Sequence, residues 1–184
     1  MATYVLEQIL SPQECAEIIE LGTTKGIKKH DNVINSNAVE VDKSVRSTDI
    51  YFINEVEIYK KIMPHVTRLN HWGYNFTRVE PLQLGIYNEG DHYDWHVDHD
   101  GQAYDSSAGP FAGLHRQLSF SILLNEDFDG GEFVMENDVV IPLNIKGTML
   151  LFPSTRPHKV NPVTHGTRYS LVGWCCGENN ANFK

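Results

Sequence analysis

Residues 87–100 hold the densest group of chemically capable side chains in this 184-residue chain. His96 and Asp98 lie two positions apart, and side chains at positions i and i+2 of a strand point to one face. One rigid strand would therefore supply two metal ligands, and we expect His158 to supply the third from a distant segment. Two imidazoles and one carboxylate suit an iron(II) ion that keeps open coordination positions.

Other interpretations of these histidines compete with an iron site. His92 lies four residues before His96, as in the zinc motif H-E-x-x-H, but Tyr93 follows His92 where that motif has Glu. The Asp- and Gly-rich surroundings also form helix poorly. A His-x-Asp tripeptide occurs by chance in many chains, so a polar loop whose histidines, His99 among them, face solvent is the alternative without a metal.

Arg168 is the candidate for the far end of a metal-bound cosubstrate. It lies ten residues after His158, and residues 162–166 between them resemble a hairpin turn. A hairpin would place Arg168 on the strand adjacent to His158, roughly 10 Å away. The guanidinium fork binds carboxylates bidentately, so a short dicarboxylate held on the metal could reach it. The alternative is a surface arginine on an edge strand.

Two helices are expected in the first part of the chain. Ser11 and Glu14 have the spacing of a capping box and predict a helix that begins at Pro12. Asn54 is the predicted cap of a second helix, within which Pro64 should cause a kink or a break. The apolar residues of that second helix follow helical spacing at Ile58, Ile62, Val66 and Leu69.

After Gly73 the pattern changes to short apolar runs separated by turn residues. Strands spaced about 8–12 residues apart indicate a β-sandwich or barrel. The expected strands are Asp49–Ile53, Pro81–Tyr87, Leu118–Leu124, Gly131–Met135, Val139–Leu143, Thr148–Phe152 and Arg168–Trp174. We predict one mainly β domain over 1–184, with two helices in 1–75 and an antiparallel jelly-roll core in 76–176. The polar segments 26–47 and 100–113 are candidate lids.

The bulk composition excludes several classes of protein. The formal net charge of −9 argues against binding to nucleic acid, which requires clustered Lys and Arg. Three cysteines without C-x-x-C spacing argue against a disulfide framework. No basic leader and no run of 18 apolar residues is present, so we expect a cytoplasmic protein that does not enter a membrane.

The order of the motifs from Leu82 to Trp174 resembles the prolyl 4-hydroxylase family of Fe(II)- and 2-oxoglutarate-dependent dioxygenases, near its PKHD-type and oxygen-sensing branches. The resemblance rests on Tyr87, Gly90, Tyr93, His96-Val-Asp98, Asp129-Gly-Gly-Glu-Phe133, Gly147-Thr-Met-Leu-Leu-Phe152, Pro157-His158-Lys-Val-x-Pro162, Gly166-x-Arg168-Tyr169 and Trp174.

The resemblance implies a double-stranded β-helix that uses Fe(II), 2-oxoglutarate and O₂, and it suggests ascorbate as an accessory reductant. His96, Asp98 and His158 would bind iron, Arg168 would bind the distal carboxylate of 2-oxoglutarate, and Tyr87 would hydrogen-bond the same molecule. The residues expected to line the site or contact substrate are Tyr93, Trp174 and Arg46, to which the position of Arg116 before a predicted core strand adds a fourth.

The resemblance also implies an activity, the hydroxylation of a C–H bond, with proline in a peptide or protein as the expected substrate and C4 as the expected position. The same chemistry on a small molecule, another residue or a nucleobase is the first alternative, and the acidic charge weakens its nucleic-acid form. A jelly roll that binds metal without catalysis is the second. Arg168 and Tyr87 argue against it, because simple metal binding needs neither.

Overall fold

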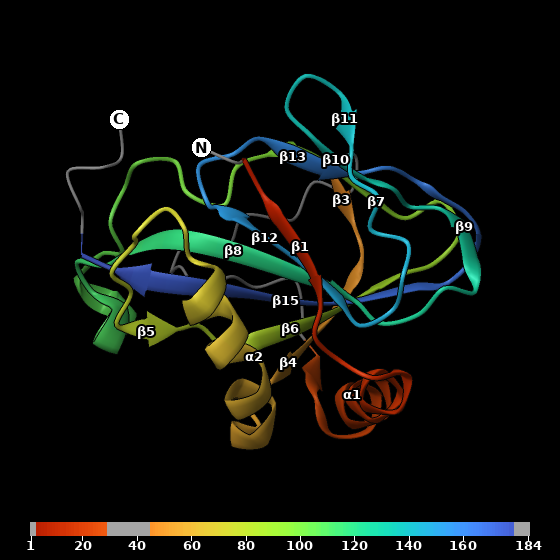
Figure 1. Cartoon of the computed structure of the whole chain (residues 1–184), viewed down its shortest axis with the longest axis horizontal. Coiled ribbons are helices and arrows are strands. Elements are labelled where there is room, and N and C mark those ends of the chain that lie inside the picture. The colour runs from red at the N-terminus through yellow and green to blue at the C-terminus, as the bar shows by residue number, and fades with distance from the viewer. Residues whose placement is uncertain (1–2, 29–44, 179–184) are drawn as a thin grey trace.

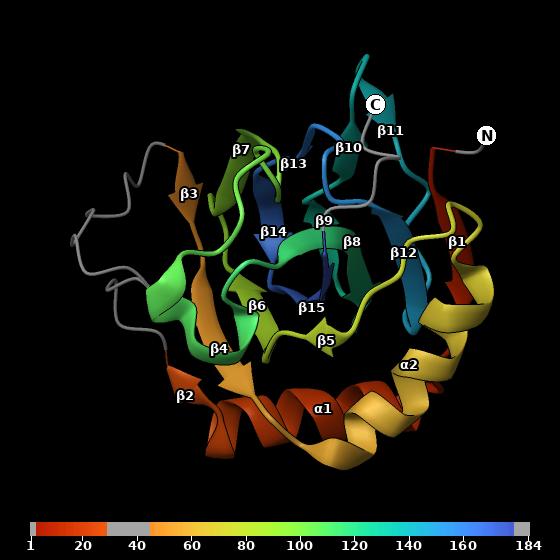
Figure 2. The same cartoon turned by 90° about the vertical axis from the view of Figure 1, so that its left-hand side faces the viewer.

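The computed structural model describes residues 3–28 and 45–178. Within them the chain is mostly β structure, arranged as two antiparallel sheets with α-helices on the outer face of the larger sheet (Figure 1; Figure 2). The predicted mainly β, antiparallel architecture is confirmed. Residues 29–44 of the candidate lid 26–47 lie outside the described residues.

The larger sheet, the major sheet, forms the floor of the molecule. In the described chain its strands follow the order β1 (Val5–Gln8), β12 (Thr148–Pro153), β8 (His115–Leu123), β15 (Arg168–Gly177), β6 (Leu82–Tyr87), β4 (Asp49–Ile53) and β2 (Ile27–Lys28), and β5 (Arg78–Val79) pairs with β15. The predicted strand 49–53 is observed with those bounds. The short β1 and β5 were not predicted, because neither is long enough to show an apolar alternation.

The smaller sheet, the minor sheet, lies over one end of the major sheet. Its order is β11 (Val139–Val140), β10 (Phe133–Met135), β13 (His158–Val160), β7 (His92–His96) and β3 (Arg46–Ser47). A separate ribbon pairs β14 (Val163–Gly166) with β9 (Phe128–Gly130). This ribbon carries the chain from β13 in the minor sheet to β15 in the major sheet.

Helix α1 (Pro12–Lys25) begins as the sequence predicts. The Ser11 hydroxyl accepts the Glu14 N–H, and the Glu14 carboxylate accepts the Ser11 N–H at 2.9 Å, which completes the capping box. The short 3-10 helix η1 (Ser106–Phe111) interrupts the long segment between β7 and β8.

Helix α2 (Val56–Leu69) departs from the prediction at two points. Glu55 rather than Asn54 is the N-cap and makes no side-chain capping bond, because the chain stays extended for one residue longer after β4. The helix also continues through Pro64. The carbonyl that loses its hydrogen bond belongs to Lys60 on the exposed side, where water can replace the missing N–H.

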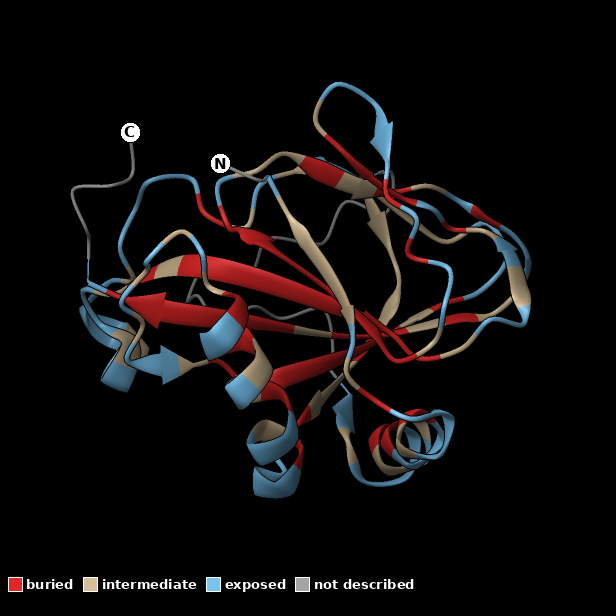
Figure 3. Ribbon diagram, viewed as in Figure 1, coloured by how far each residue is buried: buried red, intermediate tan, exposed pale blue. Residues whose placement is uncertain are grey.

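Two apolar layers hold these elements together. The first lies between the helices and the major sheet, where Ile62 and Val66 of α2 belong to one buried cluster with Phe120 and Leu171. The second lies between the two sheets and contains Phe133, Phe152 and Val160 among others. Figure 3 shows the central strands of the major sheet buried along their length, whereas the outer faces of the helices are exposed. No helix in the described part of the chain is long and apolar enough to cross a membrane.

Alternation along the major-sheet strands creates a polar floor beneath the minor sheet. On β8, Leu118, Phe120 and Ile122 face the helices, so Ser119 and Ser121 face the opposite way. The same alternation on β6 and β15 places more polar side chains on that inner face. These strands therefore combine a packed outer face with an inner face that can bind a polar ligand.

Candidate active site

A bulge in β7 positions the first metal-ligand candidate. His96 pairs with His158 across the β7–β13 ladder and Tyr93 pairs with Val160, so three steps on β7 oppose two on β13. The extra residue rotates the strand by one position. Tyr93 and His96 consequently face the same way and stack with ring centroids 3.5 Å apart. In a regular strand, residues three apart would point to opposite faces.

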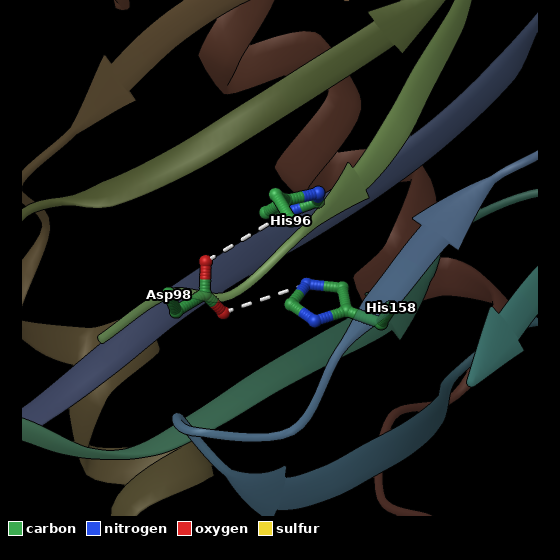
Figure 4. A group of neighbouring side chains, drawn as sticks. All are labelled: His96, Asp98 and His158. Atoms are coloured by element: carbon green, nitrogen blue, oxygen red, sulfur yellow. Dashed lines mark ion pairs between the residues drawn. The ribbon is translucent and has the colours of Figure 1, made fainter. Parts of the chain in front are cut away.

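His96, Asp98 and His158 meet as the sequence predicted (Figure 4). Their candidate ligand atoms all lie within 4.8 Å of one another. His158 Nε2 lies 3.6 Å from Asp98 Oδ2, and His96 Nε2 lies 3.9 Å from Asp98 Oδ1. Asp98 sits two residues beyond the end of β7, so the pair is not on one strand as expected, although the two side chains still converge.

Both imidazoles are held so that Nε2 faces the shared space. His96 Nδ1 lies 2.8 Å from the carbonyl of Asp94, and His158 Nδ1 lies 2.9 Å from the carbonyl of Arg156. A carbonyl only accepts, so each Nδ1 carries the proton and donates it. Each Nε2 is then left with a free lone pair, which is the arrangement a metal-binding histidine requires.

The charge state of the group also suits a cation. Burial and the nearby His158 lower the pKa of His96 to about 4, so its imidazole is neutral at pH 7. Burial alone would raise the pKa of Asp98, but the charges of His158 and Arg116 outweigh it and hold that pKa below its ordinary value. An ionised carboxylate beside a neutral imidazole suits a divalent ion, because metal ligands must be deprotonated.

The zinc alternative loses its structural basis. His92 and His96 lie on strand β7, whereas the H-E-x-x-H motif requires a helix. His92 is also not part of the ligand group, and its Nδ1 lies 3.3 Å from the Gly90 carbonyl. A structural zinc site usually has four protein ligands, and the group found in the described chain has three.

Arg168 lies opposite the ligand group, and the predicted path to it is wrong. It does not follow His158 by a hairpin on the adjacent strand. The β14–β9 ribbon takes the chain across to the major sheet, where Arg168 opens β15 and pairs with Tyr87 of β6. A ten-residue separation fits a hairpin and a crossing between sheets equally well, so the sequence could not distinguish them.

Arg168 is a buried cation with room for an anion. Its side chain is 2% exposed and burial lowers its pKa, yet a guanidinium stays protonated in proteins. Among the described residues no carboxylate forms an ion pair with it, and the centroid of the Tyr87 ring lies 5.4 Å from its Cζ. A desolvated positive charge of this kind favours an anionic ligand.

One cavity contains these groups. Its lining includes the three ligand candidates, Arg168 and Tyr87, and also Arg46, Tyr93 and Trp174. Arg116 is absent from the lining, although we expected it to line the site or contact substrate. Its Nε and Nη2 bind both carboxylate oxygens of Glu80, at 2.6 and 2.7 Å, and this leaves little of its guanidinium to face a substrate.

Several polar lining residues were not predicted. They come from the inner face of the major sheet and are Gln83, Ser119, Ser121 and Ser170. Their signal was present as polar residues at alternate positions within otherwise apolar strands. A strand buried on both faces would normally be apolar throughout, so this alternation could have indicated a polar cavity.

Known proteins resemble part of this chain in sequence. The sequence profile of the 2OG-Fe(II) oxygenase superfamily matches residues 82–176. A PKHD-type hydroxylase of Janthinobacterium sp. (strain Marseille) is 36% identical over 104 residues, which cover 53% of this chain and 43% of the relative. The matched region therefore spans less than half the length of that relative.

Solved structures share the fold over nearly the whole chain. A viral collagen prolyl hydroxylase from Paramecium Bursaria Chlorella virus-1, solved with 2-oxoglutarate, superposes with a TM-score of 0.71 at 19% identity, covering 96% of this chain and 97% of that one. A prolyl hydroxylase from Trichoplax adhaerens, bound to a hypoxia inducible factor peptide, gives 0.71 at 20% identity, with 94% and 83% covered. These likenesses establish the jelly-roll fold.

Proposed function

Because this chain belongs to the 2OG-Fe(II) oxygenase superfamily, we propose that it binds one Fe(II) through His96, Asp98 and His158 and hydroxylates a C–H bond. The observation that carries the proposal is the convergence of one buried carboxylate and two imidazoles whose Nδ1 atoms are already committed. Three protein ligands leave room on the metal for a bidentate cosubstrate and for O₂.

The residues around Arg168 fit 2-oxoglutarate. In our proposal Arg168 binds its distal carboxylate and Tyr87, the cross-strand partner of Arg168, hydrogen-bonds the same molecule. Fe(II), 2-oxoglutarate and O₂, when bound, supply the oxidation, in which 2-oxoglutarate becomes succinate and CO₂ and one oxygen atom enters the substrate. The chain orients the reactants and excludes water, and Phe133 and Phe152 pack on the His158 ring for this purpose.

A metal titration and an activity assay test the oxygenase proposal together. The wild-type chain should bind one Mn(II) or Co(II), and with Fe(II) it should release succinate from 2-oxoglutarate. His158→Ala and Asp98→Ala should lose most metal affinity and all turnover. His92→Ala, on the same strand as His96, should keep both. Full succinate release by His158→Ala would refute the assignment.

The proposed substrate is a proline within an extended peptide or protein, hydroxylated at C4. Two donors in the cavity support it, because Arg46 Nε and Trp174 Nε1 are buried without a hydrogen-bond acceptor in the described structure. An extended peptide presents backbone carbonyls, which are acceptors of the kind these donors require. The proline ring is rigid, so holding one carbon at the reacting centre costs little ordering entropy.

Free carboxylic acids are the competing substrates, since Arg46 would bind a carboxylate equally well. Peptides with acetylated and amidated ends separate the two, because they retain internal carbonyls and lose terminal charges. A peptide enzyme accepts a blocked proline peptide, and mass spectrometry of the product should locate the added oxygen at C4. If blocked peptides are inert while a free acid drives succinate release, the peptide proposal fails and the oxygenase proposal survives. Parallel reactions with and without ascorbate test the accessory reductant.

A further inference from the structure

Arg116 and Glu80 form a part-buried ion pair beside Asp98. The pair is bidentate, with Nε–Oε1 and Nη2–Oε2 distances of 2.6 and 2.7 Å, and Glu80 is 5% exposed. Burial by itself would lower the pKa of Arg116, but the hydrogen bonds and charge of Glu80 keep that pKa above its ordinary value. The Arg116 guanidinium therefore keeps its charge beside Glu80, in a place where charges are costly to bury.

A second bulge turns Arg116 toward the site. On the β8–β15 ladder Leu118 pairs with Cys175 and Arg116 pairs with Cys176, so Gln117 is one extra residue on β8. Without the bulge Arg116 would share the helix-facing side of Leu118. With it, the guanidinium lies 4.0 Å from the Trp174 ring centroid, on the cavity side of the sheet.

The backbone of Asp98 is held on both sides. Its N–H donates to the Ser154 carbonyl at 3.0 Å, and its own carbonyl accepts from Arg116 Nη1 at 3.4 Å. The Ser119 side chain also hydrogen-bonds the Asp98 carboxylate, and its hydroxyl oxygen lies 2.9 Å from that of Ser154. Asp98 lies beyond the end of β7, so these contacts replace the sheet ladder that fixes His96 and His158.

Glu80 connects this arrangement to the segment between β7 and β8. Its carboxylate also accepts hydrogen bonds from the Tyr104 hydroxyl and, at 3.4 Å, from Cys176 Sγ. Tyr104 in turn closes the segment on itself, since its N–H donates to Leu114 and its carbonyl accepts from Gly113. The segment that leaves at Asp98 and returns at Arg116 is thus tied at both ends and at its middle.

We infer that Arg116 is a positioning residue, which fixes the Asp98 carboxylate for the metal through its backbone carbonyl and its charge while Glu80 orients Arg116. This role rests on the metal site of the proposed function and differs from the substrate contact expected from the sequence. It predicts that loss of the Glu80–Arg116 pair weakens metal binding although neither residue can ligate the ion.

The test compares two double variants that each replace a Glu–Arg pair by glutamines. Glu80→Gln with Arg116→Gln removes both buried charges together, which avoids stranding one of them and favours folding. Glu7→Gln with Arg68→Gln removes the exposed pair between β1 and α2 and is the matched control. Mn(II) affinity is measured by isothermal titration, and Co(II) binding is followed through its visible absorption bands, both under argon without substrate.

The inner-pair variant should melt cooperatively, bind Mn(II) about 10- to 100-fold more weakly than wild type and show altered Co(II) bands, as changes beside metal ligands do. The control pair should leave affinity and bands unchanged. Wild-type affinity and bands in a folded inner-pair variant would overturn the role of Arg116 while the metal site stands. No metal binding by wild type would instead overturn the proposed function, and this inference with it.

If the inner-pair variant does not fold, Tyr104→Phe and Arg116→Lys decide the question. Lysine keeps the charge but cannot bind Glu80 and the Asp98 carbonyl together. The Arg116→Lys variant should therefore retain only part of the wild-type Mn(II) affinity. Tyr104→Phe should speed amide hydrogen exchange in segment 99–114 and leave Mn(II) affinity within about twofold. Wild-type Mn(II) affinity in Arg116→Lys, together with unchanged amide exchange in Tyr104→Phe, would contradict the positioning role of Arg116.

Discussion

The tautomers of His96 and His158 are fixed by the same kind of local contact. In each case Nδ1 donates to the backbone carbonyl two residues earlier in the sequence. The adjacent backbone, rather than a distant side chain, therefore sets the tautomer of each imidazole. The geometry of the ligand group therefore depends on the local backbone of β7 and of the turn before β13. The residue types and spacing were readable from the sequence, but these carbonyl contacts were not, because they depend on the dihedral angles of single residues.

Arg168 and Tyr87 should contribute unequally to cosubstrate binding. A hydrogen bond to a charged group is worth about 1.5–3 kcal/mol, and each 1.4 kcal/mol is a factor of about ten. Arg168→Ala should therefore raise the 2-oxoglutarate concentration for half-maximal succinate release roughly 10- to 100-fold, and Tyr87→Phe should raise it less. Mn(II) titrations of both variants should match wild type. Identical 2-oxoglutarate curves for wild type and Arg168→Ala would mean that the carboxylate is held elsewhere.

At the scale of the strand, two single-residue bulges determine which side chains face the site. One in β7 brings Tyr93 and His96 to the same face, and one at Gln117 turns Arg116 inward. The strands themselves could be predicted from apolar alternation. The bulges could not, because neither contains a Gly or Pro to mark it, and one extra residue reverses the face of everything beyond it.

A substitution at Gly173 tests the packing of β15 against β8 on the helix-facing side of the major sheet. It pairs with Phe120, and an added Cβ would lie 2.3 Å from Phe120 Cζ in the core beneath the helices. Gly173→Ala should cost about 1–3 kcal/mol of unfolding free energy, as overpacking does. Urea denaturation measures the loss. Adding Phe120→Leu should recover part of it, and a double variant that loses the full sum of both single costs would contradict the contact.

The ionised Glu14 carboxylate at the start of α1 should make stability depend on acid pH. The hydrogen bond from Lys61, followed by those from Ser11, lowers the pKa of Glu14 to about 2 from 4.5. Because the folded pKa is the lower one, the ionised carboxylate stabilises the fold above pH 4.5, and this contribution disappears as the pH falls toward 2. Glu14 is partly exposed, so about 1 kcal/mol or less is expected.

The measurement is the difference in unfolding free energy between wild type and Glu14→Gln across pH 2.5 to 7. The difference should be largest at pH 7 and shrink below pH 4.5, whereas general acid effects on the protein cancel. Glu17→Gln is the control on the same helix, where Glu17 accepts a hydrogen bond from Gln13 but caps nothing. A wild-type advantage that grows on acidification would show that the ionised Glu14 carboxylate is not its source.

For the molecule as a whole, the site joins two sheets whose relative placement the sequence did not predict. The ligand group belongs to the minor sheet and the loop after β7, whereas Arg168 and Tyr87 belong to the major sheet. Periodicity predicted a sandwich with a helical layer, since apolar spacing is a local property. Assignment of Arg168 to its sheet required the route of the β14–β9 ribbon, which depends on contacts distant in sequence.

Because the site is divided between the two sheets, we expect metal and 2-oxoglutarate to raise the Tm one after the other. Mn(II) alone links segments at one end of the minor sheet, whereas 2-oxoglutarate held by the metal and Arg168 would link both sheets. A ligand at 100 times its Kd adds about 2.7 kcal/mol, and about 2–4 °C in Tm accompanies each kcal/mol for a chain of this size. Under argon, saturating Mn(II) should raise Tm, and 2-oxoglutarate should then raise it by about 5–10 °C more. Without metal, 2-oxoglutarate should have little effect.

Arg168→Ala should keep the first rise and lose most of the second, and His158→Ala should lose both. A full 2-oxoglutarate shift in metal-free His158→Ala would contradict a cosubstrate site that depends on the bound metal.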